Sequence, residues 1–369
     1  MKLATRSARA ESPAPQRKTR RSWLPAPLLY LLLCGLLLFV ILLAVSFGST
    51  AIPLVTIAQI LLNATGLFHI SRSWDPTFEV IILQVRMPVV IGAALVGAAL
   101  SASGVLFQGI LRNPLADPYL LGTSSGAALG AAVAFALPLD TIFLGPLFTL
   151  TPLLAFVGAL VTVMLVYLLS RTDGHTPVVT LLLAGVVINA VLIAFQTLLL
   201  TLSPNARFGI QALFNWLSGG IAVTSWQPVL IVGVIILFGI VCSMGFTGIL
   251  DTFALGEESA AHLGLRVEWY KFFFIVLASL MTAAAVSISG LIGFVGLVMP
   301  HVMRLLLGPK HRLLLPASAL GGAIFLTLAD LLARTIIAPA VLPVGIFTAL
   351  VGAPFFLFLL RYNKRAYRW

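Results

Sequence analysis

Residues 251–266, DTFALGEESAAHLGLR, concentrate ionisable side chains in one short segment of the chain. The segment holds three acids, a histidine and an arginine, whereas only 9% of the whole sequence is charged. Apolar runs flank it on both sides, so it is expected to form a structured loop at a membrane surface. A short helical piece over Thr252–Leu255 would end at Gly256, and Glu257 and Glu258 favour the start of a second. The pattern predicts polar contacts with another protein.

Other side chains that could do chemistry are sparse. His301 and His311 are candidate metal ligands, but neither has a second ligand at a suitable spacing, and Cys34 and Cys242 lie in apolar runs. We therefore predict no metal site and no cofactor bound by this chain. The sequence also contains no HExxH or GxSxG motif, which disfavours an intramembrane enzyme, and no G-x-x-x-x-G-K-[ST] phosphate loop. Any ATP hydrolysis would have to come from a separate subunit.

The composition indicates the class of protein that carries these residues. The chain of 369 residues is 60% hydrophobic, with a mean hydropathy of +1.11. Soluble domains average roughly 25% charged residues, so a soluble protein is excluded. A net charge of +11 could suggest a nucleic-acid partner. The basic residues lie beside apolar runs, however, so we predict a polytopic membrane protein in contact with lipid and not with nucleic acid.

Nine apolar runs predict ten membrane-spanning helices. About 20 helical residues cross a hydrocarbon core of about 30 Å. The run over 272–303 is too long for one span, and its Ser and Gly residues at 289–296 indicate a break within it. A less apolar stretch over 205–226 predicts a short surface or re-entrant helix. The predicted spans cover about 28–47, 81–110, 119–137, 148–169, 177–202, 228–246, two within 272–307, 315–334 and 344–360.

The basic residues orient these spans. We interpret 1–25 as a disordered basic tail, 26–361 as the membrane domain, and 362–369 as a second basic tail. With the N-terminus in the cytoplasm, 18 of the 22 Lys and Arg residues fall on the cytoplasmic side. This is the asymmetry of the positive-inside rule. Both termini and the loop 251–266 are therefore predicted to be cytoplasmic. Small residues such as Gly97 and Gly130 predict close helix packing.

Several long stretches carry a family resemblance. They lie within 84–127 (including RNPLADPYLLGTSSGA), 181–189 (LLLAGVVIN), 254–265 (ALGEESAAHLGL), 289–323 (including GFVGLVMPHVMR) and 328–360. Together they resemble the FecCD-type permeases, the membrane subunits of ABC importers for ferric siderophores, haem and cobalamin. The resemblance covers about residues 28–361. It implies an all-α polytopic protein with ten helices per subunit, of the type II importer architecture, working as a homodimer or a pair of similar chains in a prokaryotic cytoplasmic membrane.

The resemblance also gives the loop 251–266 a role. The matching segment in the family is a coupling helix pair that docks into a cytoplasmic ABC ATPase dimer, which itself uses ATP and Mg. The alternative is an ordinary amphipathic loop. The implied contact and turn residues are Leu255, Gly256, Glu257, Glu258, Ala261, Leu263 and Gly264.

At the opposite face, the family's permeases meet an extracytoplasmic binding protein through arginines. Arg86 and Arg334 match two of these positions, but Val89 stands where the family commonly has a further arginine. Snorkelling at the interface is an alternative role for both arginines. A helical pair with Asp330 is a further alternative for Arg334.

The resemblance further implies a cytoplasmic gate at the turn entering the fifth span, where this chain has Val178 and Val179 in place of the common hydroxyl residues. Ser124, Ser125 and Asn189 are expected to line the path.

An iron(III)–siderophore complex is the predicted cargo, with haem or cobalamin as the alternatives. A secondary transporter is a remote alternative, because it would need an intramembrane carboxylate on its pathway. Asp330 is the candidate for that carboxylate, and Arg334 would neutralise it.

Overall fold

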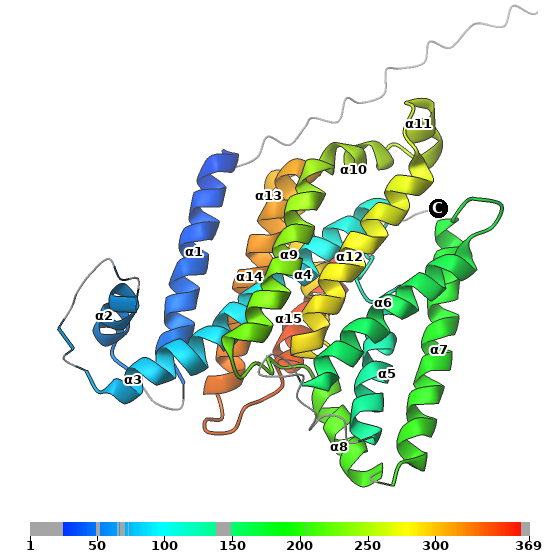
Figure 1. Ribbon diagram of the computed structural model, residues 1–369. Coiled ribbons are helices and arrows are strands. Elements are labelled where there is room, and N and C mark those ends of the chain that lie inside the picture. Colours follow the sequence, from blue (N-terminus) through cyan, green and yellow to red (C-terminus); the bar gives the residue numbers. More distant parts are fainter. Residues whose placement is uncertain are drawn as a thin grey trace, which may run out of the picture.

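The computed structural model of the chain describes residues 25–48, 52–64, 66, 71–72, 74–137, 149–204 and 206–362. The two predicted basic tails lie outside these residues, except for Pro25 and Tyr362. Apart from a two-residue bridge between Thr172 and His175, the regular elements of this part of the chain are helices. Figure 1 shows them packed side by side as a bundle, with short helices at both ends. The predicted all-α architecture is confirmed.

Within the described residues, seven helices are long and apolar enough to cross a membrane. Three shorter apolar helices, α5, α13 and α15, correspond to the remaining predicted spans. The seven are α1 (Ala26–Ser46), the continuous α3–η1–α4 (Pro76–Val80, Ile81–Arg86 and Met87–Ile110), α6 (Leu150–Ser170), α7 (Val178–Leu202), α9 (Trp226–Gly245), α12 (Val267–Ser289) and α14 (His311–Thr335). The three are α5 (Thr123–Ala136), α13 (Val295–Leu307) and α15 (Val344–Tyr362).

Local chemistry explains several helix boundaries. Asp75 caps the start of α3, where its carboxylate accepts a hydrogen bond of 2.8 Å from the Thr77 backbone N–H, and this bond lowers the pKa of Asp75. The helix α5 begins at Thr123 and not at the predicted residue 119, because Gly122 has a φ of 86° that breaks the helix. The predicted short helix is α8 (Ala206–Leu217), whereas α2 (Leu54–Ala64) was not predicted.

The predicted break within residues 272–307 is present between α12 and α13. The Ser289 carbonyl accepts from the Gly220 N–H at 2.9 Å, and the Ile288 carbonyl accepts from the Ala222 N–H at 3.0 Å. On the other side of the break, the Tyr119 hydroxyl accepts from the Ile292 N–H at 3.2 Å. Broken backbone at membrane depth is stable only where its polar groups find such partners.

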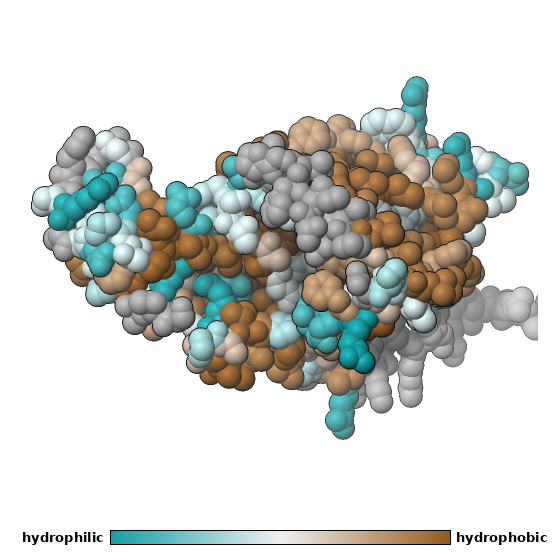
Figure 2. Space-filling model, turned by 60° about the horizontal axis from the view of Figure 1, so that its bottom comes forward, coloured by the Kyte–Doolittle hydropathy of each residue, from teal (hydrophilic) through white to brown (hydrophobic). Residues whose placement is uncertain are grey.

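Helix α4 lies at the centre of the bundle and packs against α14, α12, α13 and α9. A side chain at Gly97 would collide with the carbonyl oxygen of Gly322 in α14, and one at Gly130 would collide with the Leu154 carbonyl in α6. The predicted small-residue packing is therefore confirmed. Helix α7, in contrast, is peripheral, because only 11% of its most apolar 18-residue stretch is buried. Figure 2, with the bottom of the Figure 1 view turned forward, shows apolar side chains over much of this face, with hydrophilic groups between them.

Candidate functional site

The loop 251–266 forms two short helices at one end of the bundle. They are α10 (Thr247–Phe253) and α11 (Glu257–His262), and α11 projects from the bundle at the end where α1 begins (Figure 1). The two-helix prediction is right, but the predicted first piece, Thr252–Leu255, was misplaced because α10 already starts at Thr247 and stops at Phe253. Gly256 and Gly264 form the turns, with φ values of 114° and 83°.

This helix pair, α10–α11, points two leucines away from the protein. Leu255 is 67% exposed and Leu263 is 66% exposed, while Ala260 between them is buried against the bundle. Glu258 and Ala261 are exposed and Glu257 is half-buried. Both leucines lie in the turns that flank α11, and exposed leucines beside acidic residues form a surface typical of a protein contact. Their docking role stays a prediction.

One hydrogen-bonded contact holds α10 to the bundle. The Asp251 carboxylate lies 2.7 Å from Nδ1 of His311 and accepts a second hydrogen bond, of 3.0 Å, from the His311 backbone N–H. That N–H belongs to the first turn of α14, which has no intrahelical acceptor. The sequence predicts no metal role for His311, but the spacing of 60 residues gives no signal that Asp251 is its partner.

A second contact holds α11. The Lys271 side chain is 1% exposed, and its ammonium lies 2.9 Å from Glu257 and 3.0 Å from Glu268. It also donates to the backbone carbonyl of Thr176 at 2.9 Å. The Thr176 N–H donates to the other oxygen of Glu268 at 3.1 Å. In the sequence, Lys271 contributes to the cytoplasmic positive charge, and its spacing of three residues from Glu268 is the one local signal for the helical pair.

The predicted gate residues follow directly after this network. Thr172 and His175 exchange two backbone hydrogen bonds, of 2.8 and 2.9 Å, and so close a tight turn between α6 and α7. In the first turn of α7, Val178 is half-buried and Val179 is 69% exposed. The turn and α11 line a common cleft of about 450 Å³, to which His175, Glu258 and Trp269 contribute.

The structure brings two of the predicted path residues together. The Ser125 hydroxyl in α5 donates to the Asn189 side chain in α7, and it also lies 3.2 Å from the Gly122 carbonyl. Ser124 is half-buried beside them. These polar groups bridge two helices in a largely apolar environment. Their role in lining a path stays a prediction.

At the opposite end, Arg86 and Arg334 line one cavity of about 290 Å³, together with Val89. Arg86 is only 6% exposed, and it donates to the Val45 and Ser46 carbonyls at 2.8 and 3.1 Å, at the end of α1. Arg334 forms an ion pair of 2.8 Å with the buried Asp330, as the helical spacing suggested. Both guanidinium groups thus have internal partners, and their docking role stays a prediction.

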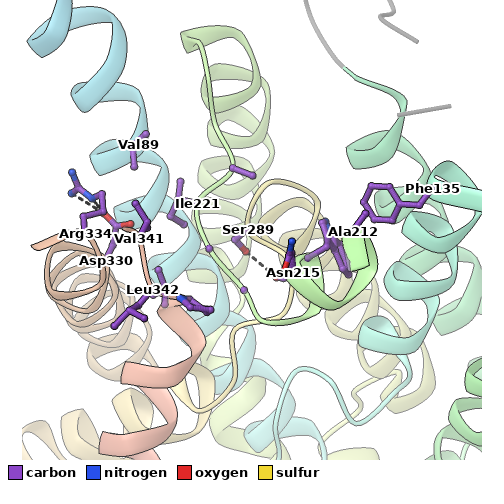
Figure 3. Close-up of a pocket in the computed structure, with 17 residues that line it drawn as sticks. Val89, Phe135, Ala212, Asn215, Ile221, Ser289, Asp330, Arg334, Val341 and Leu342 are labelled. Carbon is purple, nitrogen blue, oxygen red and sulfur yellow. Dashed lines mark hydrogen bonds and ion pairs between the residues drawn. The ribbon is translucent and has the colours of Figure 1, made fainter. Parts of the chain in front are cut away.

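A larger cavity of about 730 Å³ opens beside this pair (Figure 3). Asp330 and Arg334 lie on one side of it, and Asn215 and Ser289 lie across from them. Within the described part of the chain, no group of three or more His, Cys, Asp or Glu side chains could hold a metal ion. The His301 ring instead packs edge-to-face near Phe355, with 6.0 Å between the ring centroids.

The chain is similar to permeases along almost its whole length. It is 42% identical to the cobalamin import system permease of Halobacterium salinarum, with 77% of this chain and 74% of the relative covered. It is 41% identical to the hemin transport system permease of Yersinia pestis, covering 75% and 82%. It is 38% identical to the Fe(3+)-citrate import system permease YfmE of Bacillus subtilis, covering 90% and 96%.

Structure and family agree with these similarities. The fold matches a solved metal-chelate type ABC transporter in an inward-facing conformation, with a TM-score of 0.76 at 32% identity, covering 91% of this chain and 99% of that one. The model of the FecCD transport family matches residues 36–362. The chain therefore belongs to the FecCD transport family and is an ABC importer permease.

Proposed function

We propose that this permease moves an iron(III)–siderophore complex across the cytoplasmic membrane of a prokaryote, with a binding protein outside and a separate ATPase dimer inside. The observation that carries the proposal is the helix pair α10–α11, which presents two exposed leucines in the turns on either side of α11. Asp251 fixes α10 through hydrogen bonds to His311, and Glu257 fixes α11 through an ion pair with the buried Lys271. A rigid element of this kind can pass the motion of an ATPase to the helices behind it.

The exposed leucines and acidic side chains of α10–α11 suit a groove on an ATPase that is apolar inside and basic at its rim. Leu255 and Leu263 would enter an apolar groove, while Glu258 would bind basic residues at its rim. Asp251 and Lys271 hold the pair before docking, so little conformational entropy is lost on binding. A rigid contact also transmits force better than a flexible loop does.

A second copy of the chain is proposed to complete the pathway. Helix α7 exposes Val186, Val187 and Leu183, each more than half accessible, and few of its side chains are used within the subunit. Symmetric pairing would cover such a face in both copies. The gate residues Val178 and Val179 and the path residue Asn189 lie on the same helix, so pairing would place them near a central path.

The cargo is proposed from the relatives and from the chemistry of the chain. The relatives carry names of systems for iron citrate, hemin and cobalamin, which are all large metal complexes. The predicted path residues Ser124, Ser125 and Asn189 are neutral, which suits a bulky chelate that must pass without binding tightly. Iron–siderophore is our first choice, and haem and cobalamin are the alternatives with the same architecture.

Transport by reconstituted complexes tests this proposal. The chain, the ATPase and the binding protein encoded beside it would be placed in liposomes and offered radiolabelled iron–siderophore, haem or cobalamin. We expect ATP-dependent uptake of the iron complex and no uptake with a hydrolysis-deficient ATPase. Uptake of haem or cobalamin instead would overturn the cargo. Uptake that needs no ATPase but is abolished by an ionophore would show a secondary transporter.

A further inference from the structure

We infer that Lys271 is a positioning residue that connects α11 to the turn between α6 and α7 (residues 171–177, here the gate turn). Movement of α11 would thereby be passed to the start of α7. The inference rests on the proposed function, in which α10–α11 docks on an ATPase and Val178 and Val179 form the gate. It goes further by naming the side chain that connects the two.

The contact holds the backbone of Thr176, two residues before Val178, at both of its polar groups. The carbonyl of Thr176 accepts from Lys271 at 2.9 Å, and its N–H donates to Glu268 at 3.1 Å. Lys271 also contacts both Glu268 and Glu257. A rotation or shift of α11 therefore acts on Thr176 through the Glu257–Lys271 ion pair and the Lys271–Thr176 hydrogen bond. Thr176 itself is fully buried.

The chain after Thr176 is stiff. Pro177 follows it directly and is the N-cap of α7, with a φ of −61°. Proline fixes its own φ and restricts the residue before it, so neither residue can easily absorb a displacement. Motion imposed on Thr176 thus reaches Val178 and Val179, which occupy the first turn of α7.

Burial of the lysine makes the elements move together. The Lys271 side chain is 1% exposed, whereas those of Glu257 and Glu268 are 33% and 25% exposed. Withdrawing Glu257 with α11 would remove one of the two carboxylates that compensate this buried ammonium, which is unfavourable. The carboxylates can be rehydrated, but the lysine cannot. Separation of α11 from the gate turn is therefore disfavoured, and a correlated movement is favoured.

The hydrogen-bonded contact of α10 has a different consequence. Asp251 joins α10 to His311, at the start of α14, and α14 packs on the central helix α4. The helix α10 is thus tied to the core of the bundle, whereas α11 is tied to α12 and the gate turn. An ATPase that moves the pair would displace α11 relative to α10, and Lys271 would direct that displacement to the gate.

The test uses Lys271→Met in the full complex of chain, ATPase and binding protein. Methionine keeps the length of the side chain and removes its charge and donors. The matched control is Lys310→Met, which makes the same chemical change at an exposed lysine near the same end of the bundle. The gate is reported by Val179→Cys, in a background with Cys34→Ala and Cys242→Ala, from the rate of maleimide labelling with and without ATP on a hydrolysis-deficient ATPase.

We expect ATP to change the labelling rate at residue 179 in the parent and in the Lys310→Met control. In Lys271→Met this change should be lost, and uptake per ATP hydrolysed should fall about two- to thirtyfold, the range of coupling effects for residues between sites. ATPase co-purification should persist. Lys271→Arg, which keeps the charge, should recover part of the labelling response, and a purely structural role would not produce that recovery pattern.

A second variant covers the case in which Lys271→Met does not fold. Glu257→Gln removes only the carboxylate on α11 and should weaken the same response, while Glu268 still compensates the charge of the buried Lys271. A normal labelling response and normal uptake per ATP in Glu257→Gln or Lys271→Met would overturn the inference but leave the proposed function intact. If the parent chain itself neither binds an ATPase nor transports, the proposed function fails instead.

Discussion

The Asp251 carboxylate meets both the ring and the backbone of His311, at 2.7 Å from Nδ1 and 3.0 Å from the amide nitrogen. These residues are 60 positions apart, so the contact depends on the tertiary fold. It satisfies a free N–H in the first turn of α14 and fixes α10 on that helix. The same pair therefore stabilises a helix terminus and orients the proposed docking element.

Removal of this contact is expected to weaken the start of α14. Asp251→Ala should lower the free energy of unfolding by about 0.5–2 kcal/mol, the usual cost of losing a helix-capping acceptor. Asp251→Asn keeps an acceptor and should lose less. Thermal unfolding of the purified chain in detergent measures both variants. Equal stability of Asp251→Ala and the parent would contradict this role.

The exposed leucines are expected to carry much of the affinity for the ATPase. Leu255→Ser should weaken ATPase binding by about 1.5–3 kcal/mol if the leucine is fully buried in the complex. Titration of the detergent-purified chain with the ATPase would measure this loss. The control is Leu202→Ser, which changes a leucine that is 74% exposed at the C-terminal end of α7, opposite to the gate residues. It should leave the affinity for the ATPase unchanged. Equal effects of the two variants would argue against docking at α10–α11.

Two substitutions in the helix pair α10–α11 probe the coupling of ATP hydrolysis to uptake while keeping both leucines. Gly256 has a φ of 114°, which disfavours any side chain, and Glu258 is exposed. Gly256→Trp or Glu258→Arg should leave the permease folded but separate ATP hydrolysis from uptake. Parallel assays of ATPase activity and uptake in liposomes would show this. Unchanged uptake together with unchanged ATPase co-purification would refute the coupling role.

The contact between α4 and α14 should not tolerate even one methyl group. A Cβ at Gly97 would collide with the Gly322 carbonyl, so Gly97→Ala should destabilise the protein by about 1–3 kcal/mol. Gly35 in α1 is a matched control, because a Cβ there has no atom within 4 Å. Gly35→Ala should be neutral or slightly stabilising, since alanine favours a helix. Thermal unfolding distinguishes the two, and similar effects would contradict close packing at Gly97.

The buried ion pair in α14 predicts an asymmetric response to mutation. Arg334→Gln leaves Asp330, 2% exposed, without its cation and should cost about 3–5 kcal/mol. Asp330→Asn together with Arg334→Gln removes both charges and should recover most of the stability. Affinity for the binding protein, measured on the stable double variant, tests the docking role separately. A loss of affinity without a loss of stability in Arg334→Gln would favour docking over the ion pair.

Much of the fold could be predicted because it depends on local properties of the sequence. The apolar runs located the ten major helices, the glycines at 290 and 293 located the break after α12, and Gly256 and Gly264 located the turns around α11. Helix α2 was missed because it is shorter than a membrane span. The start of α10 was misplaced, since its Thr247–Leu250 turn continues the apolar composition of α9.

The sequence by itself determined the class of protein, the order of its helices and the position of the charged loop, because hydropathy, charge and backbone preference are properties of neighbouring residues. Only the tertiary structure decided which charges meet. Lys271 reaches a carbonyl 95 positions away, and Arg86 is enclosed at the end of a helix 40 positions before it. Burial and ionic partners depend on how distant helices pack, and no local pattern encodes those distances.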